Sequence, residues 1–416
     1  METKMYHVLI RATLLLSVGL TPAVAVSQPA LPPQLTSGAP SDVPVAVQQL
    51  RWSMNDANVN SLTFRTMDTL FTTRTVPRSG SVWQLERNDR PLDFTYQFKG
   101  ERYTPEQFLD RTFTNALLVM KDGKIVYERY LNNSNADTRF MGWSMTKSFT
   151  SVLVGIALAE GRIKSLDDRI ETYLPELKGG GYEGTTIRQI LQMRSGVDYE
   201  ERYDFANPGI AATNHIDALV KNVARFADPA RTVKRLHKPG EVFQYKTIDT
   251  AVLGWLVERV SGSTIAAYMT EHLWEPLGAE RDGFFIMDGP PGVGREFNGA
   301  GYNATLRDYA RFGLMMMNQG QANGHQIISP EWVALSTKPT EPGQPGPGGA
   351  ESGYGMQWWT FGKGAYAALG LQGQYIYVDP TTRTVVVKMS HFPPADMTAS
   401  EETSAFLEAA SSWTPR

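Results

Sequence analysis

Short apolar runs that flank turn residues lie near both ends of the chain. Asp122-Gly123, a dipeptide that favours tight hairpin turns, separates the first two runs, and Asp379-Pro380 separates the second two. The predicted hairpins are 117–120 with 125–127, and 375–378 with 385–387. Strands are therefore expected at both ends of the folded chain.

The middle of the chain has apolar positions three and four residues apart, which is typical of helices. Several of these segments begin at a threonine suited to an N-cap or end just before a glycine. The predicted helices are 144–160, 186–193, 249–260, 305–318 and 398–412, the last with Thr398 and Glu401 as its capping box.

The distribution of strands and helices predicts a mixed α/β fold. Two strand-rich segments far apart in sequence must pair, because an unpaired strand edge leaves backbone groups without partners. We expect one α/β domain formed by residues 61–165 and 306–416, with residues 166–305 inserted as a mainly helical domain. A cleft between the two domains is the natural place for a site.

The N-terminus has the features of an export signal. Lys4 and Arg11 precede an apolar run over residues 12–20, and Ala23-Val24-Ala25 follows as a cleavage signal. A membrane anchor, the alternative, needs about 20 apolar residues. We therefore expect residues 1–25 to be a signal peptide, a Pro-rich extended leader over residues 26–60, and a periplasmic or secreted protein without stable membrane insertion.

Composition narrows the possible partners. The chain has 416 residues, 42% of them apolar, and a formal net charge of -3, which gives no bulk attraction to nucleic acid. It has no cysteine, and its six histidines lack metal-binding spacing, so we expect no metal and no cofactor.

The Gly- and Pro-rich segment 339–353 is predicted to be a surface loop, with a lid as the alternative. The oligomeric state does not follow from the sequence.

The candidate chemistry lies at the start of the predicted helix 144–160. A spacing of three residues puts Lys147 beside Ser144 on one helix face, where a neutral amine can take the proton of a serine hydroxyl. Farther along, Tyr245 and Thr247 are expected to point the same way in an extended loop, with Lys246 pointing outward. Tyr245 is then a candidate base, and a half-buried packing aromatic is the alternative.

These residues resemble the penicillin-recognising serine hydrolases, over roughly residues 60 to 400. The segments that carry the resemblance are Ser144-x-x-Lys147, Tyr245-x-Thr247, 158–163, 173–177 and 187–196. Residues 243–245, 255–260 and 373–374 are most similar to the class C β-lactamase-like branch, which contains 6-aminohexanoate-dimer hydrolases and carboxylesterases. The resemblance implies a β-lactamase/transpeptidase-like fold with an antiparallel sheet flanked by helices.

The resemblance also implies roles for individual residues. Ser144 is the expected acylated nucleophile, Lys147 its proton partner and Tyr245 the base. The expected oxyanion and substrate-binding residues are the backbone NH of Ser144 with that of Leu371, then Gly370, Gln372, Thr247 and Tyr203. Tyr203 matches a tyrosine that faces the scissile amide in the dimer hydrolases; a surface aromatic is the alternative.

Two departures from true β-lactamases affect the expected substrate. Thr247 stands where they have an asparagine, and the strand before Gln372 lacks their Lys-Thr-Gly, for which Lys363 is a poor substitute. Acidic residues in 198–204, Glu201 among them, are candidates to bind an ammonium group, with solvated loop charge as the alternative.

Three functions remain open at this point. The first is an exported serine hydrolase that cleaves a small-molecule amide or ester through an acyl-serine intermediate. The second is a β-lactamase or DD-peptidase. The third is a binding protein that keeps the fold without turnover.

Overall fold

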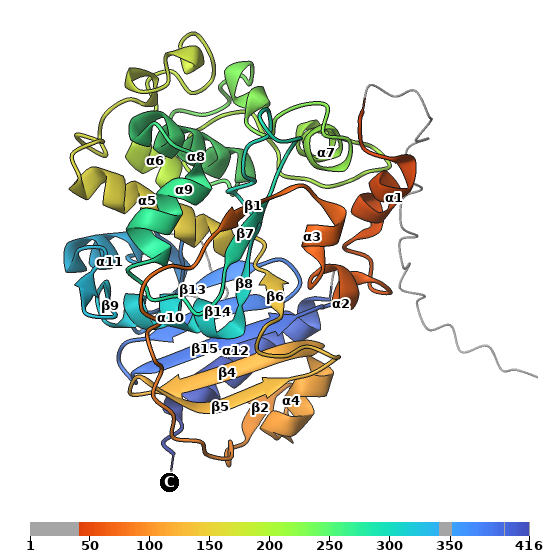
Figure 1. Ribbon diagram of the computed structural model, residues 1–416, viewed down its shortest axis with the longest axis vertical. Helices are drawn as coiled ribbons and strands as arrows, with labels where there is room; N and C mark the ends of the chain where they lie inside the picture. The colour runs from red at the N-terminus through yellow and green to blue at the C-terminus, as the bar shows by residue number, and fades with distance from the viewer. Residues whose placement is uncertain (1–40, 341–351, 395, 416) are drawn as a thin grey trace, which may run out of the picture.

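The computed structural model describes residues 41–340, 352–394 and 396–415. A seven-stranded antiparallel sheet, in the order β11-β12-β13-β14-β15-β4-β5, crosses the lower half of the molecule (Figure 1). Its strands are β4 (Thr114–Lys121), β5 (Lys124–Tyr130), β11 (Gly353–Tyr354), β12 (Trp359–Gly362), β13 (Ala365–Gly370), β14 (Gln374–Asp379) and β15 (Thr384–Ser390). Both predicted hairpins are confirmed, and Val119 of β4 pairs with Val386 of β15, which joins the two ends of the chain.

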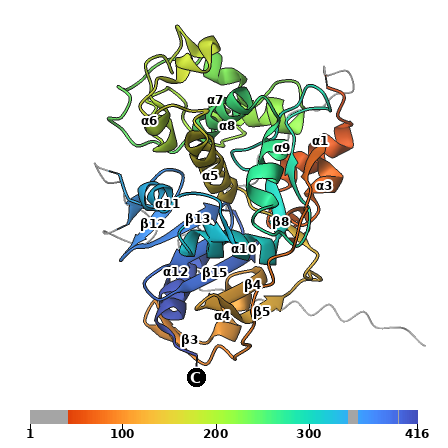
Figure 2. The same cartoon turned by 60° about the vertical axis from the view of Figure 1, so that its left-hand side comes forward.

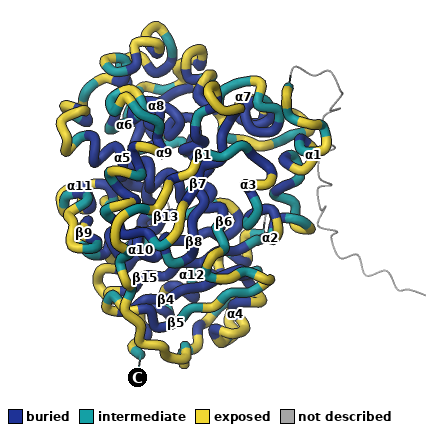
Figure 3. Tube along the Cα trace, in the orientation of Figure 1, coloured by how far each residue is buried: buried dark blue, intermediate teal, exposed yellow. Residues whose placement is uncertain are grey.

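Alternate residues of these strands belong to two different apolar cores. Leu117 and Val119 pack with α4 (Pro105–Arg111) and α12 (Met397–Ser412), whereas Leu118 and Met120 pack with α10 (Leu306–Met317). This is the two-residue period expected of a sheet that is covered on both faces. Buried positions run through the sheet and also through the helices above it (Figure 3).

A helical layer lies on the other side of the larger core (Figure 2). Its elements are α5 (Met145–Ala159), α6 (Ile187–Leu191), α7 (Ile210–His215), α8 (Thr247–Ser261), α9 (Ile265–Met269) and the short turns η1 (Ile170–Thr172), η2 (Pro175–Leu177), η3 (Ile216–Val220), η4 (Asp228–Arg231) and η5 (Thr270–Trp274). The long helix α5 contacts both α8 and β13, so it lies between this layer and the sheet. It is buried from Met145 to Ala157, as expected of a helix that is apolar on most faces.

The expected helical insertion over residues 166–305 also contains strands. β7 (Gly283–Ile286) and β8 (Tyr302–Thr305) form a four-stranded sheet with β1 (Thr73–Val76) and β6 (Arg139–Met141), in the order β1-β7-β8-β6. These strands are four residues long or shorter, too short to show the alternation on which the prediction relied. The insertion is therefore tied to the other domain by hydrogen-bonded strands.

The predicted leader over residues 26–60 is wrong for its described part. α1 (Val45–Ser53) begins directly after Pro44, and α2 (Asn60–Thr63) and α3 (Met67–Leu70) follow. Arg51 is buried, and its guanidinium donates to the Leu70 carbonyl at 2.7 Å and to Asn222 Oδ1 at 2.6 Å. The prolines that suggested an extended chain stop at residue 44, and the polar face of α1 then folds against the helical layer.

The remaining predictions divide into three groups. The helices predicted at 144–160, 186–193, 249–260 and 305–318 are confirmed within a few residues. The cap of α12 is Asp396, which accepts from the Ala399 NH at 3.1 Å, and not the predicted pair Thr398 and Glu401. The predicted signal peptide and most of the 339–353 loop lie outside the described residues.

Five short elements complete the described structure. They are the hairpin of β2 (Tyr96–Phe98) and β3 (Glu101–Tyr103), the hairpin of β9 (Gln321–Ala322) and β10 (His325–Gln326), and α11 (Pro330–Ser336), which follows β10. Over residues 41–340, 352–394 and 396–415, no helix combines the length and apolar character that a membrane span requires.

Candidate active site

Ser144 stands at a strained entry into α5. The preceding residue, Trp143, has a φ of 47°, a left-handed conformation that costs a residue with a large side chain free energy and persists only when its surroundings enforce it. Trp143 is buried edge-on against Phe64, with ring centroids 5.3 Å apart. The turn leaves Ser144 half-buried as the N-cap of α5, where the helix dipole favours negative charge.

Lys147 lies one turn farther along α5 and is buried. Its Nζ is 2.9 Å from Ser144 Oγ, 3.0 Å from Thr247 Oγ1 and 2.8 Å from the Gly299 carbonyl oxygen. Burial lowers the pKa of Lys147 to about 8, while the negative charge of Glu201 opposes this shift. A substantial fraction of this amine is therefore neutral in mildly alkaline solution.

Tyr245 completes the contacts of the serine. The Ser144 side chain lies close enough to the Tyr245 hydroxyl to lower its pKa against the effect of burial, and Lys147 Nζ lies 4.9 Å from the centroid of the Tyr245 ring. Burial, followed by the charge of Glu201, raises the pKa of Tyr245 above its usual value. The structure thus brings together Ser144, Lys147 and Tyr245.

Thr247 and Lys246 differ from their expected placements. Thr247 is turned inward as the first residue of α8, where it contacts Lys147 rather than a substrate space. Lys246 is 0% exposed, although the alternation of an extended loop predicted an outward side chain. Its backbone is extended as the N-cap of α8, so the prediction failed because the fold covers the side opposite Tyr245, and not because the alternation is lost.

Tyr203 reaches the site with its hydroxyl. Its side chain is 42% exposed, yet Thr247 is near enough to the hydroxyl to lower the pKa of Tyr203 against the effect of burial. The ring lies next to Phe205 and His215, with centroids 6.3 Å and 5.8 Å away. Of the acidic residues in 198–204, Asp204 pairs with Arg202 at 2.9 Å, whereas Glu201 faces Thr247.

The expected oxyanion strand approaches the serine closely. A side chain at Gly370 would come within 2.2 Å of the Gly142 carbonyl oxygen, so this position needs a glycine for β13 to pass beside the turn that holds Ser144. Leu371 is 49% exposed, and its carbonyl accepts from the Gln374 amide at 3.0 Å. Gln372 is buried and donates to the Asn55 carbonyl at 2.8 Å, so its amide braces the N-terminal segment instead of facing a substrate.

Residues 106–410 match the beta-lactamase family. The chain belongs to the beta-lactamase family. It is also 34% identical to the 6-aminohexanoate-dimer hydrolase of Paenarthrobacter ureafaciens over 309 residues. The aligned region covers 70% of this chain and 76% of that protein.

Solved structures agree with the family. A proposed 6-aminohexanoate-dimer hydrolase from Bacillus anthracis superimposes with a TM-score of 0.76 at 25% identity, over 86% of this chain and 95% of that one. A family VIII carboxylesterase has the same fold, with a TM-score of 0.55 at 18% identity over 73% and 94% of the two chains. The expected β-lactamase/transpeptidase-like fold is confirmed, and the chain is a beta-lactamase-fold serine hydrolase.

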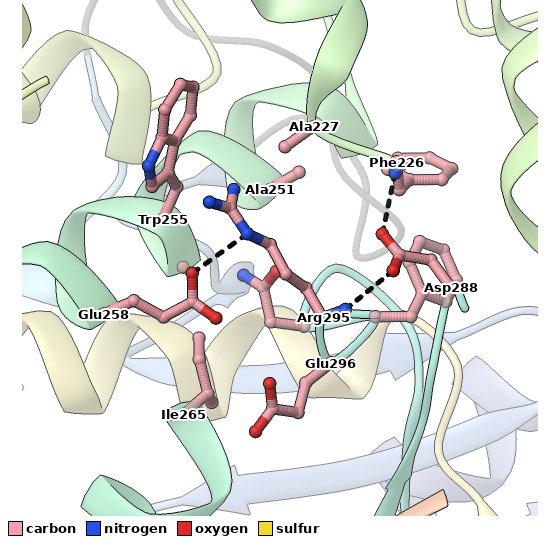
Figure 4. Close-up of a pocket in the computed structure, with 12 residues that line it drawn as sticks. Phe226, Ala227, Ala251, Trp255, Glu258, Ile265, Asp288, Arg295 and Glu296 are labelled. Atoms are coloured by element: carbon pink, nitrogen blue, oxygen red, sulfur yellow. Dashed lines mark hydrogen bonds and ion pairs between the residues drawn. The ribbon is translucent and has the colours of Figure 1, made fainter. Parts of the chain in front are cut away.

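In this beta-lactamase-family chain, the carbonyl that holds Lys147 comes from a firmly anchored segment, residues 295–299. Figure 4 shows a small pocket behind α8 in which Arg295 lies between Glu258 and Asp288. The Arg295 Nε is 3.3 Å from Glu258, and its backbone NH donates to Asp288 at 2.7 Å. The Asn298 side chain donates to the Thr250 carbonyl at 2.7 Å, which fixes the next residue, Gly299, beside Lys147.

Sequence reasoning missed the contacts of two residues with the site. Glu201 was considered only as a possible ammonium ligand, and Gly299 was not considered. Neither had a local signal, since each contacts Lys147 or Thr247 only through the tertiary fold. Within the described residues no cluster of three or more His, Asp or Glu side chains is arranged to hold a metal ion.

Proposed function

We propose that this protein is an exported hydrolase that cleaves a small-molecule amide or ester through an acyl-enzyme on Ser144. The observation that carries the proposal is the 2.9 Å approach of Lys147 Nζ to Ser144 Oγ, at the N-terminus of a buried helix. A buried amine with a pKa of about 8 can act as a base near neutral pH. Carboxylesterases and the dimer hydrolase among its relatives support this class of substrate.

Acylation begins with proton transfer from Ser144 to neutral Lys147. The serine oxygen then attacks the substrate carbonyl, and the carbon–oxygen bond forms as negative charge moves to the carbonyl oxygen. Because burial raises the pKa of Tyr245, this residue keeps its proton in the resting protein. That direction favours Lys147 as the first proton acceptor and leaves Tyr245 to pass the proton to the leaving nitrogen or oxygen. The charge on the carbonyl oxygen then returns to form the carbonyl again, the bond between the carbonyl carbon and the leaving atom breaks, and the amine or alcohol departs.

The developing oxyanion needs two donors. The backbone NH of Ser144 lies at the positive end of α5, and the approach of Gly370 to Gly142 supports the NH of Leu371 as the second donor. Water activated by the same Lys147 and Tyr245 pair then attacks the acyl carbonyl. The ester bond to Ser144 breaks, the serine recovers its proton, and the acid product leaves.

Esters and amides with an apolar acyl group are the favoured substrates. Tyr245 stacks on Trp359 with ring centroids 5.8 Å apart, and Tyr354 packs edge-on against Trp359 at 4.9 Å, which gives the site an aromatic wall. Lys363 is exposed in the turn before β13, whereas Gly370 ends that strand. Five residue steps of strand separate the two ends of β13, about 17 Å, so Lys363 is a poor anchor for a β-lactam carboxylate.

Substrate preference can be measured with one ester and one β-lactam. We expect a higher kcat/KM for p-nitrophenyl butyrate than for nitrocefin, because an activated ester needs no carboxylate anchor and no proton on its leaving group. The opposite order would instead support the β-lactamase or DD-peptidase alternative.

The nucleophile can be identified by labelling with a fluorophosphonate and with a fluorescent penicillin, followed by mass spectrometry of the adduct. We expect rapid phosphonate labelling at Ser144, none in Ser144→Ala and little with penicillin. Ser148→Ala is the matched control, because Ser148 lies one turn along the same helix and donates to the Gln357 carbonyl at 2.7 Å. Undiminished labelling of Ser144→Ala would refute the assignment.

Export rests on the sequence of residues 1–25 alone. Expression of the full chain with a C-terminal tag, followed by cell fractionation and N-terminal sequencing, tests it. We expect a periplasmic or secreted product that begins at Val26, and a full-length cytoplasmic product contradicts export.

A further inference from the structure

The carboxylate of Glu201 accepts two hydrogen bonds from Thr247. The Thr247 hydroxyl donates to Glu201 Oε1 at 2.6 Å, and the Thr247 backbone NH donates to Glu201 Oε2. The same hydroxyl oxygen accepts from Lys147 Nζ at 3.0 Å. Two hydrogen bonds therefore connect Glu201 to the lysine that faces Ser144.

The chemistry of a hydroxyl explains why a carboxylate is useful here. An amide side chain has a separate acceptor oxygen, but a hydroxyl can accept from Lys147 only while its own proton points elsewhere. Glu201 accepts that proton and so holds the lone pair of Thr247 toward Lys147. Only a carboxylate offers two acceptor oxygens to two donors, here a hydroxyl and a backbone NH.

The charge of Glu201 also acts on the lysine. It raises the pKa of Lys147 against the stronger effect of burial, and it is the one charged group that acts on Lys147 in this way within the described residues. The other groups that face Lys147 are neutral: Ser144, the Tyr245 ring and the Gly299 carbonyl. In the described parts of the chain no lysine or arginine forms an ion pair with Glu201. Burial lowers the pKa of a second lysine, Lys246, and the charges of Asp249, Asp198 and Glu201 oppose this shift.

From this geometry we infer that Glu201 is a positioning residue for Lys147, acting through Thr247. It fixes the threonine hydroxyl as an acceptor and sets the pH at which the lysine becomes neutral. The inference rests on the proposed function, in which neutral Lys147 takes the proton of Ser144. Tyr203, two residues farther along the chain, also interacts with Thr247.

The test compares Glu201→Gln with the parent enzyme over a pH series, using p-nitrophenyl butyrate. Removal of the charge lowers the pKa of Lys147, so the acidic limb of the kcat/KM profile should move to lower pH by roughly one unit. The glutamine offers a donor where Thr247 needs an acceptor, so we expect kcat to fall about tenfold or more, with KM within about threefold. A merely structural role would leave the acidic limb in place.

Asp168→Asn is the matched control. Asp168 is a half-buried carboxylate that also accepts from one hydroxyl and one backbone NH, of Tyr173 at 2.6 Å and Ser165 at 3.2 Å, outside the site. Its replacement should move neither kcat nor the pH profile. Should Glu201→Gln fail to fold, Thr247→Ser and Thr247→Val test the same connection, because serine keeps the hydroxyl and valine keeps only the shape.

Three outcomes are informative. A shifted limb in Glu201→Gln, with Thr247→Ser close to the parent and Thr247→Val impaired, supports the inference. An unmoved limb with kcat within about twofold of the parent, or equal activity of the serine and valine variants, overturns it. Fluorophosphonate labelling separates the two hypotheses: a parent enzyme that does not label at Ser144 refutes the proposed function, whereas labelling with an unmoved limb refutes only the role of Glu201.

Discussion

Among the lysines that are buried in the described part of the chain, Lys147 and Lys388 have closely similar partners, and only Lys147 faces the candidate site. Lys147 Nζ contacts Ser144, the Gly299 carbonyl and the ring of Tyr245. Lys388 Nζ, in the sheet, contacts Ser390, the Thr112 carbonyl at 3.0 Å, and the rings of Phe392 and Phe108 at 4.6 Å and 5.3 Å. Burial lowers the pKa of both amines.

The two sites differ in the exposure of the serine and in whether the aromatic partner of the lysine carries a hydroxyl. Ser144 is half-buried at a helix N-terminus, whereas Ser390 is fully buried within β15. The aromatic partner of Lys147 carries a hydroxyl that reaches the serine, but the partners of Lys388 are phenyl rings. A buried lysine beside a serine is therefore not enough: a nucleophile also needs a route for substrate and a path for its proton.

The largest expected contrast comes from making the same change at both lysines. Lys147→Met should lower kcat for p-nitrophenyl butyrate by at least about a hundredfold, the usual scale for losing a general base. Lys388→Met should leave kcat within about twofold of the parent, because the sheet separates it from Ser144. Steady-state kinetics on both variants, with circular dichroism to establish folding, decides this, and equal losses would remove the distinction between the two sites.

The second change makes the environment of Lys147 more like that of Lys388. Tyr245→Phe keeps the ring beside Lys147 but removes the hydroxyl that contacts Ser144, so we expect a loss of about a hundredfold in kcat. Residues that handle one proton together are non-additive, so the double variant with Lys147→Met should be little worse than the worse single variant. Near-normal turnover by Tyr245→Phe, with a native circular dichroism spectrum, would identify Tyr245 as a packing residue.

The pH profile is the third test. If neutral Lys147 is the base, kcat/KM should rise about tenfold per pH unit on the acidic side and level off above a pH of about 8. Burial lowers the pKa of Lys147, so this lysine loses its proton at a lower pH than a free lysine does, and activity rises on the acidic side of that pH. A profile that stays flat from about pH 6 to pH 9 would mean that the base is another group.

The local parts of this fold and site were predictable from the sequence. Ser144 and Lys147 lie on one helix face because of their spacing alone, and the hairpin 117–127 follows from its turn residues. A search for this spacing does not find Lys388 and Ser390, which are two residues apart on a strand.

The other contacts depend on tertiary structure. Glu201 meets Thr247 across 46 residues, and Gln372 meets Asn55 across 317, distances at which sequence pattern carries no signal. Lys246 was misplaced because the side to which its side chain points is covered by the fold and not by solvent, although its backbone is extended as expected. The helix α1 was missed because the prolines before it dominated the composition of its surroundings.

The smallest expected effect is on stability, and it concerns Lys388. The pKa of Lys388 is lowered in the folded protein and returns to about 10.4 on unfolding. Between these two values the unfolded chain binds the extra proton, so folding stability should rise with pH, by about 1.4 kcal/mol per unit for this one group. Lys388→Met lacks the group, and the other titrating residues cancel in the difference between the two proteins.

The measurement is urea unfolding of the parent and of Lys388→Met at several pH values from about 8 to about 9.5, below the free-lysine pKa. The difference in the free energy of unfolding should move in favour of the parent as the pH rises. Its absolute sign at one pH is not decisive, because the methionine also leaves the Thr112 carbonyl without its donor. A difference that stays constant across this range would mean that Lys388 titrates as it does in water.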